Sequence, residues 1–174
     1  VNVIGDVDIE PDEDFSLNLS NVTSNAVILD AVGVGIIEND DISSNITCEN
    51  ATITPNTLWP PNHKWVTLDV EGVLDANGDP ADITVTSIFQ DEPVDHLGDG
   101  NHVPDGRGVG SDSPEVRRER SGLGDGRIYI IGFDAVAPGS QSCSGEVTVG
   151  VPHDQGQGST PIDSGDRFDS TVAP

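Results

Sequence analysis

The chain has 174 residues and a formal net charge of −24, from 31 acidic and 7 basic side chains. So large an excess of negative charge argues against nucleic-acid binding and disfavours anionic membrane surfaces, because both would repel the protein. Aromatic residues make up only 4% of the chain, whereas 20 glycines and 12 prolines accompany short β-branched runs, which predicts an all-β protein with many turns.

The N-terminal part of the chain alternates short apolar stretches with acidic turns. Four strands are predicted before the acidic run at 39–41, and the last two are expected to form a short hairpin: 1–4, 15–20, 26–30 and 33–38. In the second strand, Phe15, Leu17 and Leu19 alternate with polar residues and therefore share one face.

The pattern restarts at Ile42 with a longer series of strands and turns. Five further strands are predicted: 50–55, 65–72, 83–89, 127–135 and 145–151. In the last of them, Val147, Val149 and Val151 share one face. Short strands separated by frequent Gly and Pro turns favour a β-sandwich.

Two stretches carry too few apolar residues for a core. The polar, Gly-rich stretch 91–126 is expected to be a long loop or a loop that contains a small hairpin. Residues 155–174 are expected to form an extended tail or linker. The tail includes the sequence DRFDSTV, which could add as a strand to a neighbouring sheet edge.

The motifs GDVDIEPDEDFSLNLSN and GVGIIENDD lie within residues 1–42. This segment resembles the C-terminal half of a Calx-beta domain, which implies a partial sandwich. The resemblance also implies a Ca²⁺ site formed by the acidic turn and the terminal acidic pair, with the ligands Asp6, Glu10, Asp40 and Asp41. Ca²⁺ binds six to eight oxygen ligands, and clustered carboxylates are costly unless a cation neutralises them. A solvated acidic turn is the alternative.

Residues 43–156 contain the motifs TLWPPNHK, DEPVDHLGDGNHVPDG and VPHDQG. They resemble a bacterial extracellular Ig-like module, commonly a non-catalytic part of large secreted or surface proteins. The resemblance implies an Ig-like β-sandwich over residues 43–154. The expected fold is therefore all-β: an Ig-like β-sandwich preceded by a partial Calx-beta sandwich at 1–42, with an extended C-terminal tail at 155–174.

The loop DHLGDGNHVPDG is a second candidate calcium site. Its oxygen-bearing side chains are close in sequence, and its glycines allow tight curvature; the candidate ligands are Asp95, Asp99, Asn101 and Asp105. The alternative is a turn capped by these side chains. His63 and His153 are expected to hold turns, since no nucleophile stands in an elbow-type turn and no second base is evident, and the chain is not expected to be an enzyme.

Cys48 and Cys143 are the only cysteines in the chain. The simplest interpretation is one disulfide in an extracellular protein, which would close a loop with an entropic contribution of about 4 kcal/mol. Two buried free thiols are the alternative. No apolar run approaches the length of a transmembrane helix, so no membrane insertion is expected.

These predictions suggest a secreted or cell-surface protein whose first segment needs additional strands. The strands would come from other copies of the chain by β-strand complementation, or from neighbouring domains of a longer chain. The predicted function is a non-catalytic structural subunit or module of a calcium-stabilised extracellular filament or cell-surface assembly. The alternatives are a calcium-dependent adhesion or ligand-binding module of a large surface protein, and an accessory domain of a secreted hydrolase.

Overall fold

A computed structural model describes residues 10–23, 25–39, 46–75, 78–95, 97–137, 141–156 and 159–173. The chain divides into two compact units, Val1–Ser43 and Ser44–Pro174. Every regular secondary-structure element within the described ranges is a β-strand, so this part of the protein is all-β as predicted. In the same ranges, no helix has the length and apolar character to cross a membrane.

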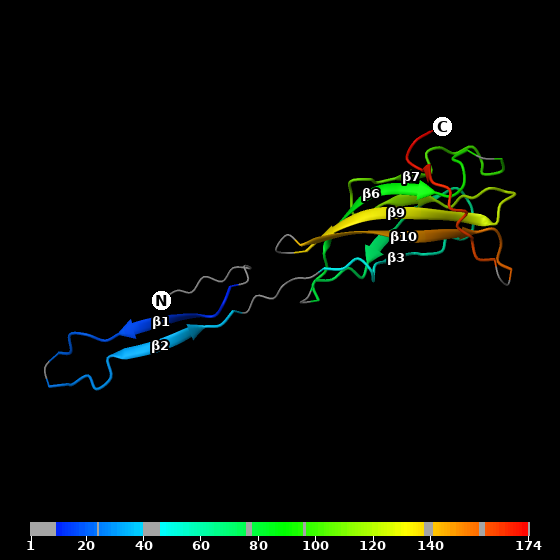
Figure 1. The fold of residues 1–174 in the computed structure, drawn as a ribbon. Helices are drawn as coiled ribbons and strands as arrows, with labels where there is room; N and C mark the ends of the chain where they lie inside the picture. Colours follow the sequence, from blue (N-terminus) through cyan, green and yellow to red (C-terminus); the bar gives the residue numbers. More distant parts are fainter. Residues whose placement is uncertain are drawn as a thin grey trace. The chain divides into compact units, whose positions relative to one another are not determined.

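The described part of the first unit is an antiparallel pair formed by β1 (Glu13–Asn18) and β2 (Val32–Ile37) (Figure 1). Phe15 lies opposite Gly35, and a Cβ on that glycine would come within 2.5 Å of the Phe15 ring. The predicted hairpin between 26–30 and 33–38 is wrong, because β2 pairs with β1 and 26–30 belongs to the connection between them. The predicted strand at 1–4 lies outside the described residues.

The longest strands of the second unit form one antiparallel sheet, in which β6, β9 and β10 lie side by side (Figure 1). The order in this sheet is β10 (Ser142–Pro152), β9 (Gly126–Val136), β6 (Asp82–Gln90) and β11 (Phe168–Asp169). The three long strands match the predictions at 83–89, 127–135 and 145–151.

Shorter strands form two further sheets in this unit. One pairs β3 (Thr52–Thr54) with β5 (Asp69–Glu71), and the other has the order β4 (Trp65–Thr67), β8 (Glu115–Arg117), β7 (Gly106–Arg107). The single strand predicted at 65–72 is divided at Leu68, which is fully buried and donates its backbone N–H to Pro114 O. The β7–β8 pair is the small hairpin expected within 91–126.

One apolar core joins these sheets. Val147, Val149 and Val151 are buried on a common face of β10, as their alternation predicts. They belong to the same cluster as Ile53 of β3 and Val116 of β8. Sheets on both sides of the core therefore contribute to its burial, as in a β-sandwich.

The disulfide between Cys48 and Cys143 is confirmed, and the alternative of two free thiols is excluded. The two Cα atoms are 5.8 Å apart, and the residues are separated by 95 positions in sequence. Cys143 lies in β10, whereas Cys48 lies shortly before β3. Both half-cystines pack against the apolar core. The bond therefore ties the beginning of the second unit to its main sheet.

The described part of the C-terminal tail packs on the main sheet of its own chain. In β11, Phe168 and Asp169 pair with Gln90 and Phe89 of β6. The next residue, Ser170, donates its backbone N–H to Ile88 O and accepts hydrogen bonds from the backbone N–H groups of Asp105 and Gly106. The tail thus covers the outer edge of β6 at its last three residues, 88–90, and reaches the loop that contains the second candidate calcium site.

Candidate functional site

A group of charged and polar side chains is buried where β9 meets the loop after β6. We name it the Arg127 cluster, and its members are Gln90, Glu92, Asp99, Asp105, Glu119, Arg127 and Tyr129. The side chain of Arg127 is fully buried. On β9 it has the same parity as Tyr129 and Ile131, so strand alternation directs it towards the interior.

Arg127 binds three carboxylates of the cluster. Its Nη1 lies 2.8 Å from Asp105 Oδ2, and its Nε lies 3.1 Å from Glu92 Oε2. Its Nη2 lies 3.9 Å from Asp99 Oδ2. Gln90 Nε2 donates to the same oxygen of Asp105. The positive charge of one guanidinium thus compensates carboxylates that come from both ends of the acidic loop.

Glu119 brings a further carboxyl group into this cluster. Burial raises its pKa to about 8, and the negative charge of Asp105 contributes to the shift. Glu119 Oε2 lies 3.2 Å from Nδ1 of His63, so a protonated Glu119 can donate a hydrogen bond to that nitrogen. Burial also raises the pKa of Asp105, although Arg127 opposes this shift. Protonation of Glu119 therefore lowers the negative charge of the cluster, in addition to the positive charge that Arg127 contributes.

The predicted ligands of the acidic loop separate into two pairs. Asp99 and Asp105 are both buried and approach Arg127. Asp95 and Asn101 are exposed and have positive φ values of 65° and 56°, which are typical of turn positions. The Asn101 backbone N–H donates to Asp99 Oδ1, as in a side-chain-capped turn.

Calcium binding at this loop stays a prediction. Among the residues that the structure describes, no group of three or more His, Cys, Asp or Glu side chains is arranged to hold a metal ion. Neither Arg127 nor Glu119 is among the site residues predicted from the sequence. The signal available for Arg127 was its parity with the apolar residues of β9, whereas nothing in the local pattern around Glu119 indicates burial.

A hydrogen bond connects the two segments at the acidic end of the first unit. Of its predicted ligands, Glu10 is exposed, whereas Asp6, Asp40 and Asp41 lie outside the described residues. Asp12 Oδ1 accepts a hydrogen bond from the backbone N–H of Asn39 at 2.9 Å. This bond brings the acidic turn before β1 beside the segment after β2. The calcium site at this end also stays a prediction.

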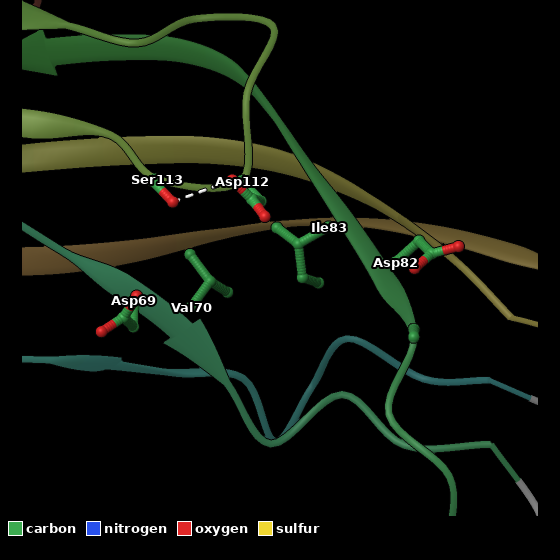
Figure 2. Close-up of a pocket in the computed structure, with 7 residues that line it drawn as sticks. Asp69, Val70, Asp82, Ile83, Asp112 and Ser113 are labelled. Carbon is green, nitrogen blue, oxygen red and sulfur yellow. Dashed lines mark hydrogen bonds between the residues drawn. The ribbon is translucent and has the colours of Figure 1, made fainter.

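A depression of about 280 Å³ lies beside β5 and β6 (Figure 2). Val70 and Ile83 point towards each other across it, whereas the carboxylates of Asp69 and Asp82 are directed away from each other. Asp112 accepts a hydrogen bond from Ser113 Oγ. Because these carboxylates do not converge, the depression offers an acidic rim but no common point at which they could bind one ion.

His153 is held by weak contacts at the end of β10. Its Nδ1 lies 3.5 Å from Asp154 Oδ2, and its Nε2 lies 3.4 Å from Gly122 O. Ser159 Oγ accepts the Asp154 backbone N–H rather than a hydrogen bond from the imidazole. The contact with Gly122 connects the segment after β10 with the segment between β8 and β9. The expectation that the chain is not an enzyme stays a prediction.

The chain matches no protein-family model, no curated protein and no solved structure. The resemblances to a Calx-beta domain and to an extracellular Ig-like module therefore rest on the motifs alone.

Proposed function

We propose that this chain is a non-catalytic structural subunit of an extracellular filament or cell-surface assembly. In this proposal the β1–β2 hairpin is completed by strands from another copy. The second unit is an Ig-like sandwich that serves as a stable body, and Ca²⁺ stabilises the acidic end of the first unit. The disulfide supports an oxidising, extracellular location, where such bonds persist.

The observation that carries this proposal is the exposure of the β1–β2 hairpin. Most large apolar side chains of the two strands and their connection are more than a third exposed: Phe15, Leu17, Leu19, Val22, Val27, Leu29, Val32, Val34 and Ile36. An isolated two-stranded hairpin is marginally stable in water, and a contiguous apolar surface of this kind marks an interaction site. Additional strands would remove these side chains from water.

Both faces of the hairpin carry apolar residues. The register places Phe15 and Leu17 on one face, opposite Gly35 and Gly33. Successive side chains alternate, so Val34 and Ile36 lie on the other face. Strand addition at an edge would extend the hairpin, while a packed sheet would cover one of its faces.

The experiment compares the wild type with the double variant Leu17→Ser and Ile36→Ser, which changes one residue on each face. Light scattering after size-exclusion chromatography should show concentration-dependent assembly of the wild type and loss of assembly in the variant. The control is Leu97→Ser with Leu123→Ser, because these leucines are 76% and 84% exposed in the second unit. The control should assemble like the wild type.

Two outcomes contradict the proposal. One is a wild type that remains monomeric up to about 1 mM, a concentration at which even weak association is measurable. The other is equal assembly of the hairpin variant and the wild type. Circular dichroism of both double variants verifies that the second unit remains folded.

A further inference from the structure

The few basic side chains of this acidic chain are concentrated on one sheet. Residues 1–63 contain neither Lys nor Arg. Of the seven basic residues, Arg127 is buried and Arg167 lies in the C-terminal tail. The other five lie within or directly beside the sheet β4–β8–β7: Lys64, Arg107, Arg117, Arg118 and Arg120.

The outer face of this sheet carries a stack of one aromatic ring and two guanidinium groups. Val66 of β4 and Val116 of β8 pack into the core, so the adjacent Trp65 and Arg117 face outwards. The guanidinium carbons of Arg107 and Arg117 each lie 4.3 Å from the centroid of the Trp65 ring. We define the basic face by these three residues and the exposed Lys64.

The arginines of the basic face are held in position by their own chain. Arg117 donates hydrogen bonds to Pro104 O and His63 O, at 2.9 and 3.0 Å. Arg107 donates to Glu115 Oε2 and still has a side chain that is 52% exposed. Contact with an aromatic ring fixes both guanidinium groups further. Binding of a partner to this face therefore costs little side-chain entropy of these two arginines.

A complementary surface lies at one end of the hairpin. β1 begins and β2 ends there, and the exposed carboxylates are Asp12, Glu13, Asp14 and Glu38. Among the described residues, none of these four forms an ion pair with Lys or Arg. The first unit has no basic residue of its own, so a protein cation at this end must come from elsewhere.

We propose that the basic face binds this acidic end of the hairpin in a second copy of the chain. The inference rests on the proposed function and specifies which surface of the sandwich the neighbouring hairpin meets. A net charge of −24 repels two copies over most of their surfaces. The basic face is where the charge of the approaching hairpin is attracted, so it selects the orientation of the encounter.

The first test reverses one charge on the basic face in the full-length protein. Sedimentation in EGTA compares Arg107→Glu with Arg167→Glu, which changes the net charge equally at an exposed arginine of the tail. Arg107→Glu should weaken self-association by about tenfold or more, whereas Arg167→Glu should stay within about twofold of the wild type. Added NaCl should weaken wild-type association and have less effect on Arg107→Glu.

A second test restores the contact with opposite charges. Glu13→Lys with Asp14→Lys should weaken association, and adding Arg107→Glu to this variant should recover it. The control is Asp125→Lys with Asp166→Lys, two exposed carboxylates of the second unit that give the same change in net charge. Recovery in the triple variant requires that the two surfaces meet.

The inference would be overturned by unchanged association of Arg107→Glu, by equal weakening through both arginine reversals, or by no recovery in the triple variant. Loss of assembly through Leu17→Ser with Ile36→Ser, alongside normal assembly of Arg107→Glu, would leave the proposed function standing without this contact. An effect on the hydrodynamic radius of a monomer, with no effect on mass, would place the contact within one chain and also contradict the inference.

Discussion

Arg127 is the residue on which the charge balance of the buried cluster depends. It contacts Asp105 and Glu92 directly, and its own side chain is fully buried. A buried ion pair adds little net stability compared with a well-packed apolar pair, but removal of one partner leaves the other charge in a medium that solvates it poorly. The carboxylates would then have to take up protons or draw in water.

Replacement of Arg127 by Leu is therefore expected to lower the free energy of unfolding by about 3–5 kcal/mol. Urea denaturation followed by Trp fluorescence measures this change. The matched control is Arg167→Leu, because Arg167 forms an exposed pair with Asp163 and its loss should cost less than about 1 kcal/mol. Similar unfolding midpoints for the two variants would contradict this account of the cluster.

The raised pKa of Glu119 predicts the direction in which the free energy of unfolding changes with pH. Its pKa is about 8 in the folded protein and near 4.5 when the chain is unfolded. Between these values the unfolded state releases a proton that the folded state retains, so the free energy of unfolding should fall as pH rises from about 4.5 to 8. Below this window both states are protonated, and Glu119 contributes no pH dependence.

Thermal melts at pH 5 and pH 8 measure this effect in the wild type and in Glu119→Gln. The amide cannot ionise, so the variant should lose part of the pH dependence and melt higher than the wild type at pH 8. The difference between the pH profiles should be on the order of 2–5 kcal/mol. Identical slopes for the two proteins would show that Glu119 does not titrate in this range.

β11 and the residues around it close the outer edge of β6 at its C-terminal end, residues 88–90. An uncovered strand edge exposes backbone donors and acceptors that can pair with another chain. Ser164 adds to the closure, because its Oγ donates to Asp91 O and its backbone N–H donates to the Asp91 carboxylate. The tail therefore acts as a covering strand of its own sandwich.

Deletion of residues 163–174 should expose that edge and remove the hydrogen bonds of Ser164 and Ser170. The expected loss of stability is on the order of 2–4 kcal/mol, together with faster aggregation on heating. Differential scanning calorimetry and light scattering measure the two effects. Deletion of 172–174 alone keeps β11 and serves as the control. If the longer deletion melts like the control, the tail contributes nothing to the edge.

The elements that the sequence predicts best are those whose environment is encoded by alternation. Val147, Val149 and Val151 define the buried face of β10 without reference to any other strand. Alternation within β2 does not identify the strand with which it pairs. A nearby turn signal favoured pairing with 26–30, whereas Phe15 of β1 packs across Gly35, a contact between residues 20 positions apart. Pairing over such a distance depends on side-chain packing between segments that a short stretch of sequence does not include.

The same limit explains which part of the buried cluster was predictable. The sequence predicts that Asp99 and Asp105 lie close together, along with Asp95 and Asn101, because all four belong to one loop. Arg127 and Glu119 join them from β9 and from the segment after β8. Their meeting follows from the register of the sheets, which the sequence pattern does not specify.

The net charge of −24 determines how the stability of the protein responds to ions. Self-repulsion destabilises a compact acidic chain, so NaCl should raise the melting temperature by screening. Ca²⁺ should raise it further at equal ionic strength, because a ligand that binds only the folded state stabilises that state. Comparison of the two increases in melting temperature distinguishes general charge screening from Ca²⁺ binding at a specific site.

Asp40→Ala with Asp41→Ala should remove the calcium-specific part of this increase and retain the NaCl effect. Melting curves in Ca²⁺, EGTA and NaCl at matched ionic strength provide the measurement. Asp69→Ala with Asp112→Ala changes the net charge equally at the rim of the depression in Figure 2 and is the control. A calcium response that survives the first variant and not the second would move the site to the sandwich.

The bond between Cys48 and Cys143 has a mechanical consequence. A pulling force applied through the first unit reaches Cys48 and passes covalently into β10, so the segment of 95 positions between the cysteines carries no tension. At about 3.5 Å per extended residue, roughly 330 Å of chain is withheld from stretching. Under load the oxidised protein can lengthen only through residues outside this loop, whereas the reduced protein can unfold along its whole length.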